Sequence, residues 1–136
     1  MFIDTGAFVA LRNRSEYEHE IARATLRELV DEQAELFTSN YVFAETYTAL
    51  LVRVGRTEAI NWGKHFLAGE AIESIRADQD IEQRAWSILE THADKAWSYV
   101  DATSFALIER ERLTSAFAFD RHFAQRGLNV LPAPPG

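Results

Sequence analysis

The chain has 136 residues, of which 47% are hydrophobic and 26% are charged, and its net charge at pH 7 is −7. This length suits one domain with its own core, and the absence of cysteine excludes disulfides, zinc–thiolate sites and cysteine nucleophiles. The acidic balance argues against a nucleic-acid binder that works only by neutralising phosphates.

A nuclease is still compatible with this charge. Bound divalent cations would offset part of it, and twelve of the 14 basic residues are arginine, whose planar fork suits phosphate. No apolar run is long enough to span a membrane. A first strand that begins at Phe2 leaves no room for a signal peptide. We therefore expect a cytoplasmic protein with no membrane partner.

Short apolar runs alternate with helical patterns along the chain. Met1–Asp4 predicts a buried strand that Thr5-Gly6 ends, Ser39 and Asp78 are predicted N-caps, and Gly55 is a predicted helix stop. The predicted strands cover residues 1–4, 36–38, 71–75, 115–119 and 128–131, and the predicted helices cover 16–32, 40–54, 57–68, 79–92 and 100–113. This alternation predicts an α/β sandwich with a mostly parallel sheet. Residues 1–131 are expected to form a single domain, and 132–136 a proline-rich tail.

Four acidic residues lie where apolar runs meet helices. Asp4 ends the first predicted strand, Asp101 opens the last predicted helix, and Asp120 follows the fourth predicted strand. Glu45 lies in a helix that is otherwise largely uncharged. Acids at the carboxyl ends of parallel strands should meet in one crevice. The pattern therefore predicts a shared acidic site.

Carboxylates that share a crevice repel one another. A pair about 4 Å apart costs roughly 4 kcal/mol at an effective dielectric of 20, and a hard divalent cation with oxygen ligands relieves that repulsion. Without the cation, at least one of the acids should have a raised pKa. The pattern is typical of a metal-dependent phosphodiesterase site.

Each acid also has a simpler interpretation. Asp4 and Asp101 could serve only as helix caps, and Asp120 could be an ordinary turn residue. Glu45 could lie on a solvated helix face. Taken one at a time the acids favour these structural roles, but their equivalent positions in successive α/β units favour a common site.

Four segments of the chain resemble the PIN domain, and specifically the VapC-type toxin ribonucleases of bacterial and archaeal toxin–antitoxin modules. They are MFIDTGAFVAL (Met1–Leu11), TSNYVFAET (Thr38–Thr46), YVDATSFAL (Tyr99–Leu107) and AFAFDRHFAQRGLNVL (Ala116–Leu131). The resemblance implies a three-layer α/β/α sandwich whose acidic pocket binds Mg²⁺ or Mn²⁺ and cleaves RNA with metal-activated water. It also implies an antitoxin partner and a homodimer.

By motif position, Asp4, Glu45, Asp101 and Asp120 correspond to the acidic cluster of the family. The resemblance implies that Asp4, Asp101 and Asp120 hold the metal, and that Glu45 completes the shell or orients the attacking water. The products should then carry 5′-phosphate and 3′-hydroxyl ends. Some members have a further acid after the fourth, where this chain has Arg121. The number of metal ions therefore stays open.

Residues near the motifs are candidates for contact with RNA. Thr5 matches the small hydroxyl residue that often follows the first acid, and His122 could orient a phosphate or a water, although a surface histidine is the simpler reading. Arginines near the motifs could hold the RNA backbone: Arg12, Arg14, Arg121 and Arg126. The other histidines have no partner at metal-ligand spacing, which argues against zinc.

Trp62, Phe66 and Leu67 gather on one predicted helix. They are expected either to pack in the core or, by the resemblance, to form the dimer surface.

Two other functions were weighed. A receiver-like signalling domain would need an acidic pair after the first strand and a lysine near the last, and the chain has only Lys64 and Lys95. A PIN-like domain that binds RNA or protein without cleaving it is the remaining alternative, and the four intact acids argue against it.

Overall fold

The protein alternates short strands with helices, and the computed structural model describes residues 1–133. The strands are β1 (Phe2–Ile3), β2 (Leu36–Ser39), β3 (Ile72–Ile75), β4 (Ser115–Phe117) and β5 (Asn129–Leu131). The helices are α1 (Thr5–Arg12), α2 (His19–Asp31), α3 (Asn40–Arg53), α4 (Arg56–Ala68), α5 (Gln79–Thr91), α6 (Tyr99–Arg110) and α7 (His122–Gln125).

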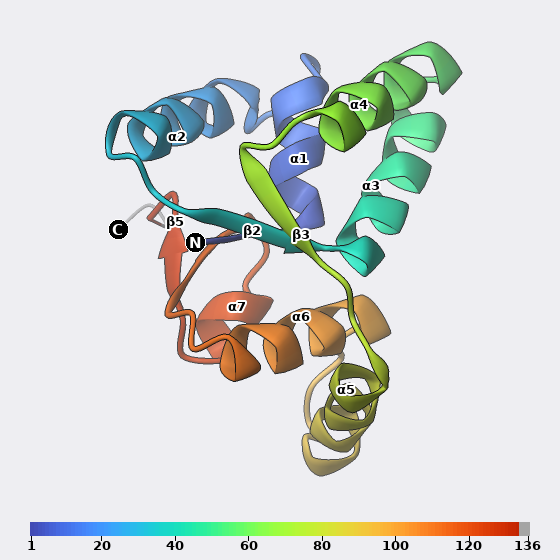
Figure 1. Ribbon diagram of the computed structural model, residues 1–136, viewed down its shortest axis with the longest axis vertical. Coiled ribbons are helices and arrows are strands. Elements are labelled where there is room, and N and C mark those ends of the chain that lie inside the picture. The colour runs from blue at the N-terminus through green and yellow to red at the C-terminus, as the bar shows by residue number, and fades with distance from the viewer. Residues whose placement is uncertain (134–136) are drawn as a thin grey trace.

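Within the described residues, the strands form one five-stranded sheet in the order β3-β2-β1-β4-β5, and every pair is parallel. Helices α1 to α4 lie on one side of the sheet, and α5, α6 and α7 lie on the other (Figure 1). The predicted α/β/α sandwich is confirmed, and the sheet is parallel throughout. Such a sheet brings the carboxyl ends of its strands to one edge.

Strand β1 is short, but it is the central strand of the sheet and is well packed. Phe2 and Ile3 are both fully buried, as expected for a parallel strand covered by helices on both faces. Phe2 stacks on Phe123 of α7, with ring centroids 6.2 Å apart. Asp4 follows directly, so its backbone position is fixed by the best-packed part of the sheet.

The predicted caps and stop on both sides of the sheet are confirmed. The Ser39 hydroxyl accepts a hydrogen bond from the backbone N–H of Val42 (3.1 Å), and the Asp78 carboxylate accepts one from Ile81 (3.0 Å). Gly55 separates α3 from α4 with φ = 130°, a conformation that residues with a side chain rarely adopt.

The first strand ends before Thr5-Gly6, as predicted, but the predicted helix ranges did not include the helix that follows. Helix α1 begins at Thr5, because glycine costs a helix only about 1 kcal/mol and burial of Phe8 and Val9 offsets that cost. The predictions also lacked α7, which is too short to show a helical period, and α2 begins at His19 rather than at residue 16.

The end of the fourth strand also differs from the prediction. Strand β4 ends at Phe117, before Asp120, so this acid lies in a bend rather than directly on the strand.

The aromatic group on α4 packs mainly inside the monomer. Trp62 is 4% exposed and contacts Phe8 and Phe43, with centroid distances of 5.5 and 5.2 Å, and also Phe66. Leu67, by contrast, is 73% exposed. Of the two predicted roles, Trp62 has the packing role.

None of the helices between residues 1 and 133 is both long and apolar enough to cross a membrane. Of the predicted proline-rich tail, residues 134–136 lie outside the described part of the chain.

Candidate active site

Asp4 lies at the centre of the acidic site. Its backbone N–H donates to the carbonyl of Phe117 (3.0 Å), so it continues the pairing of β1 with β4 just beyond the strand. It occupies the N-cap position of α1, yet within the described residues its side chain makes no capping hydrogen bond. The simple helix-cap interpretation is therefore wrong for this carboxyl group, which is 4% exposed.

The pKa of Asp4 depends on burial and on the charges of the other three acids. Burial raises the pKa of the Asp4 carboxyl well above its ordinary value, and the negative charges of Asp120, Asp101 and Glu45 raise it further. A hydrogen bond from the backbone N–H of Thr5 acts in the opposite direction. The expectation that crowding raises the pKa of at least one acid is confirmed.

Asp120 reaches the site from the bend between β4 and α7. Its Oδ1 atom accepts a hydrogen bond from the backbone N–H of His122 (2.9 Å), and its side chain is 40% exposed. Partial burial is the main reason why the pKa of Asp120 is raised, with the charge of Asp101 acting in the same direction. The neighbouring Asp4 side chain acts in the opposite direction and lowers the pKa of Asp120.

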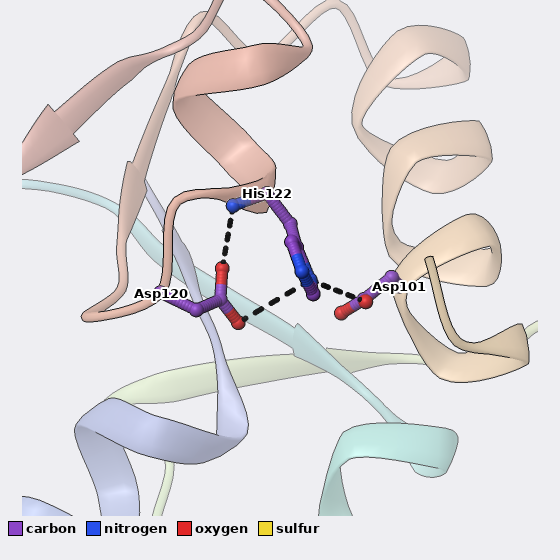
Figure 2. Close-up of side chains that lie close together, drawn as sticks. All are labelled: Asp101, Asp120 and His122. Carbon is purple, nitrogen blue, oxygen red and sulfur yellow. Dashed lines mark hydrogen bonds and ion pairs between the residues drawn. The ribbon is translucent and has the colours of Figure 1, made fainter. Parts of the chain in front are cut away.

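Asp101 is both a cap and a member of the cluster. Helix α6 begins with a capping box, in which Ser98 Oγ accepts from the Asp101 N–H and Asp101 Oδ2 accepts from the Ser98 N–H, both at 3.0 Å. The same Oδ2 atom lies 2.7 Å from His122 Nδ1. Oxygen or nitrogen atoms of Asp101, Asp120 and His122 lie within 4.8 Å of one another (Figure 2).

Glu45 joins the site from α3. It is half-buried, and its charge contributes to the raised pKa of Asp4. It lines a shallow groove of about 540 Å³ with Tyr41 and Arg53 of the same helix and Val100 of α6. A fully solvated position is therefore excluded for Glu45.

The donors at this site suit a hard divalent cation. Carboxylate oxygens of Asp101 and Asp120 lie close together, and the charges of both and of Glu45 act on Asp4; carboxylate oxygens are the ligands that Mg²⁺ and Mn²⁺ share. The hydroxyl of Thr5, next to Asp4, is buried and has no hydrogen-bond partner in residues 1–133. The residues present therefore fit a cation and its hydration shell.

The candidate RNA-binding arginines are not all near this site. Arg12 ends α1, about 12 Å of helix away from Asp4, and it pairs with Glu58 (2.8 Å) and His65 (3.0 Å). Arg14 lines a separate groove beside Arg12. Arg121 is exposed and directly follows Asp120. The structure therefore brings Arg121 to the acids but not Arg12.

Arg126 is engaged elsewhere as well. It lies over Trp97 and contacts Glu109. Thr5 and His122, the other two candidates for RNA contact, do adjoin the acids.

Sequence reasoning missed Ser98. Ser98 and Asp101 have the three-residue spacing of a capping box, which was legible in the sequence. The contact of His122 with Asp101 joins residues 21 positions apart, so no local pattern could reveal it.

The sequence profile of the PIN domain family matches residues 1–128. The chain belongs to the PIN domain family. The 23S rRNA-specific endonuclease VapC20 of Mycobacterium tuberculosis is 34% identical over 128 residues, which cover 93% of this chain and 94% of that protein. This PIN domain is a VapC-type endoribonuclease toxin.

Solved structures agree with this assignment. The crystal structure of VapC20, described as a toxin that cleaves the sarcin–ricin loop, has a TM-score of 0.84 at 30% identity and covers 93% of this chain and 95% of its own. VapBC2 of Rickettsia felis, bound to promoter DNA, has a TM-score of 0.70 at 14% identity, with 95% of both chains covered. FitAcB of Neisseria gonorrhoeae has a TM-score of 0.65 at 18% identity, covering 95% of this chain and 94% of that one. The last two support the fold alone.

Proposed function

We propose that this VapC-type endoribonuclease cleaves RNA at the crevice formed by Asp4, Glu45, Asp101 and Asp120, with Mg²⁺ or Mn²⁺ as its cofactor. The observation that carries the proposal is the cluster of Asp101, Asp120 and His122, whose ligand atoms lie within 4.8 Å of one another, together with the buried carboxyl group of Asp4, on which the charges of the other three acids act. A buried carboxyl group among three further acids is costly in a fold unless a cation compensates it. Residues 1–131 act as one catalytic domain, followed by the tail at 132–136.

Asp4, Asp101 and Asp120 would hold the cation, each from a different element of the fold. Such a cation makes water a stronger nucleophile and neutralises the negative charge that builds up on the phosphate. Glu45 is half-buried on α3, and it would complete the shell or orient the attacking water. The cleaved RNA would then carry 5′-phosphate and 3′-hydroxyl ends.

The RNA backbone would meet the crevice on the side of Arg121, which is exposed next to Asp120. Thr5 follows Asp4, and its hydroxyl has no hydrogen-bond partner among the described residues; it would contact the phosphate or a water in the crevice. His122 lies between Asp101 and Asp120. Arg12 is less suited to RNA contact because it is paired with Glu58.

The substrate we propose is 23S ribosomal RNA. The 34% identical relative VapC20 is specific for that RNA, and the match extends over nearly the full length of both proteins. A protein with this substrate acts in the cytoplasm. Its activity would be held in check by a cognate antitoxin protein, a proposal that rests on the VapC-type assignment.

A homodimer is also proposed. With Trp62 packed inside the monomer, exposed Leu67 is the member of the α4 group that a second copy could reach. Light scattering at tens of micromolar protein tests this proposal, and a monomeric mass would remove it.

The test of the function is cleavage of 23S rRNA by the purified full-length chain with Mg²⁺, with Mn²⁺ and with EDTA. We expect discrete cleavage with either ion and none with EDTA, and 5′-phosphate ends that can be ligated directly. An RNA that is bound but left intact in all three conditions would instead support the non-cleaving alternative.

A further inference from the structure

His122 contacts two of the proposed cation ligands through two different nitrogen atoms. Its backbone N–H donates to Asp120 Oδ1 at 2.9 Å, and its ring Nδ1 lies 2.7 Å from Asp101 Oδ2 and 3.9 Å from Asp120 Oδ2. The imidazole ring therefore stands between the two carboxyl groups (Figure 2).

The contact with Asp101 uses only one of its two carboxylate oxygens. Oδ2 accepts hydrogen bonds from both Ser98 N–H and His122 Nδ1–H, whereas Oδ1 has no hydrogen-bond partner among residues 1–133. The capping box needs only the bond from Ser98. The second donor, from a distant loop, fixes the rotation of the carboxylate and leaves Oδ1 available.

We propose that His122 is a positioning residue of the cleavage site, whose Nδ1–H holds Asp101 so that Oδ1 is presented to the divalent cation. This inference rests on the proposed function of the acidic crevice. Groups that orient a metal ligand by a hydrogen bond, without contacting the metal, typically contribute about 10–100-fold to metal affinity or activity. Because Nδ1 donates its proton to Asp101, it is not a ligand in this arrangement.

The fold around His122 does not depend on its ring. Phe123, the next residue, is fully buried and packs on Phe2 and Phe105, so it anchors α7. The His122 side chain is 35% exposed. Its bond to Asp120 comes from the backbone and is retained when the side chain is replaced. Substitutions at this position should therefore report on Asp101 rather than on folding.

Three substitutions separate the possible roles of the ring. His122→Asn keeps an N–H donor close to the position of Nδ1, His122→Gln moves the donor toward the position of Nε2, and His122→Ala removes it. His65→Ala is the matched control, because His65 is an exposed histidine on α4 that contacts Arg12. Melting curves confirm that each variant is folded.

The measurement is Mn²⁺ affinity of the full-length protein by calorimetry, together with electron spin echo detection of nitrogen bound to Mn²⁺. We expect His122→Ala and His122→Gln to lose about 10-fold or more in affinity and His122→Asn to stay within about 3-fold. His65→Ala should match the unsubstituted protein, which should show no directly bound nitrogen.

Unchanged affinity in His122→Ala would overturn the positioning role while leaving the cation site intact. A bound-nitrogen signal that disappears in His122→Ala, or retention by Gln with loss by Asn, would also overturn it, since either result means direct contact through the ring. If the unsubstituted protein binds no Mn²⁺, the proposed cation site fails together with this inference.

Discussion

Beyond the effect of burial, the negative charge of Asp120 raises the pKa of the buried Asp4 carboxyl more than the charge of Asp101 or Glu45 does. Burial acts in the same direction, so Asp4 is the acid expected to keep a proton when no cation is bound. A proton on Asp4 would then lie where a cation is expected to bind.

Cation binding should therefore release a proton. Ligating carboxylates must be ionised, so a cation displaces the proton of Asp4. We expect Mn²⁺ affinity to rise with pH until the pH passes the raised pKa of Asp4, and then to level off. Calorimetry in buffers with different ionisation enthalpies measures the released proton directly. An affinity that is independent of pH, with no buffer dependence of the heat, would contradict this picture.

The stability of the cation-free protein should depend on the ionisation of the Asp4 carboxyl group. The folded state holds the Asp4 proton more tightly than the unfolded chain does. Stability is therefore lost as pH rises from the unfolded value of 3.8 through the raised folded pKa. Asp4→Asn removes this loss and should raise Tm by a few degrees at neutral pH, with little effect near pH 3.8.

Thermal unfolding of both proteins in EDTA, followed across pH, checks this prediction. Added Mn²⁺ should stabilise the unsubstituted protein more than Asp4→Asn, because a ligand stabilises the state that binds it. A variant that is less stable than the unsubstituted chain at every pH would mean that the Asp4 charge supports the fold.

Arg121 and Arg12 should differ in their effect on RNA cleavage. Arg121→Ala removes an exposed charge next to Asp120 and should raise KM several-fold, with a weaker salt dependence of binding. Arg12→Ala breaks a partly exposed pair with Glu58, worth about 1 kcal/mol or less, and should leave cleavage nearly unchanged. Steady-state kinetics at two salt concentrations compares them. Equal effects of the two substitutions would contradict the proposal that RNA binds on the side of Arg121.

Glu45→Gln tests whether the half-buried acid of α3 takes part in the reaction. The substitution keeps the shape of the side chain but removes its charge, so we expect kcat to fall by roughly 100-fold, which corresponds to about 2.7 kcal/mol of transition-state stabilisation. Glu28→Gln makes the same chemical change on an exposed face of α2 and should be silent. Indistinguishable kinetics for the two variants would remove Glu45 from the site.

The sequence predicted best those features that depend on residues close together in the chain. A short, continuous apolar run predicted β1 and hence the position of Asp4. The predicted helix boundaries at Ser39, Gly55 and Asp78 are also present in the structure. The crevice followed from topology, because parallel strands bring their carboxyl ends together. The helix after Asp4 was implied by the position of this acid, but its range was not predicted, and burial of its apolar residues outweighs the glycine at its second position.

Other features of the site depend on contacts that the sequence does not encode locally. Arg12 is close to Asp4 in the chain, but α1 carries it toward Glu58 and away from the acids. His122 reaches Asp101 only because the α7 segment folds back beside α6, held by Phe123 against Phe105. Because Arg12 is near Asp4 in the sequence, its contact with RNA was overestimated. Because His122 was expected in a surface loop, its part in the site was underestimated.

The central claim is that the acidic crevice carries out RNA cleavage. The most direct measurement is the single-turnover rate of 23S rRNA cleavage with Mg²⁺ by Asp4→Asn and by Asp101→Asn. Asn keeps a side-chain oxygen that can accept the hydrogen bond from the Ser98 N–H at the N3 position of the capping box, so both variants should stay folded. We predict that each loses roughly 100-fold or more in rate while its melting temperature is unchanged or higher. Full activity in both variants would contradict the assignment of this crevice as the nuclease site.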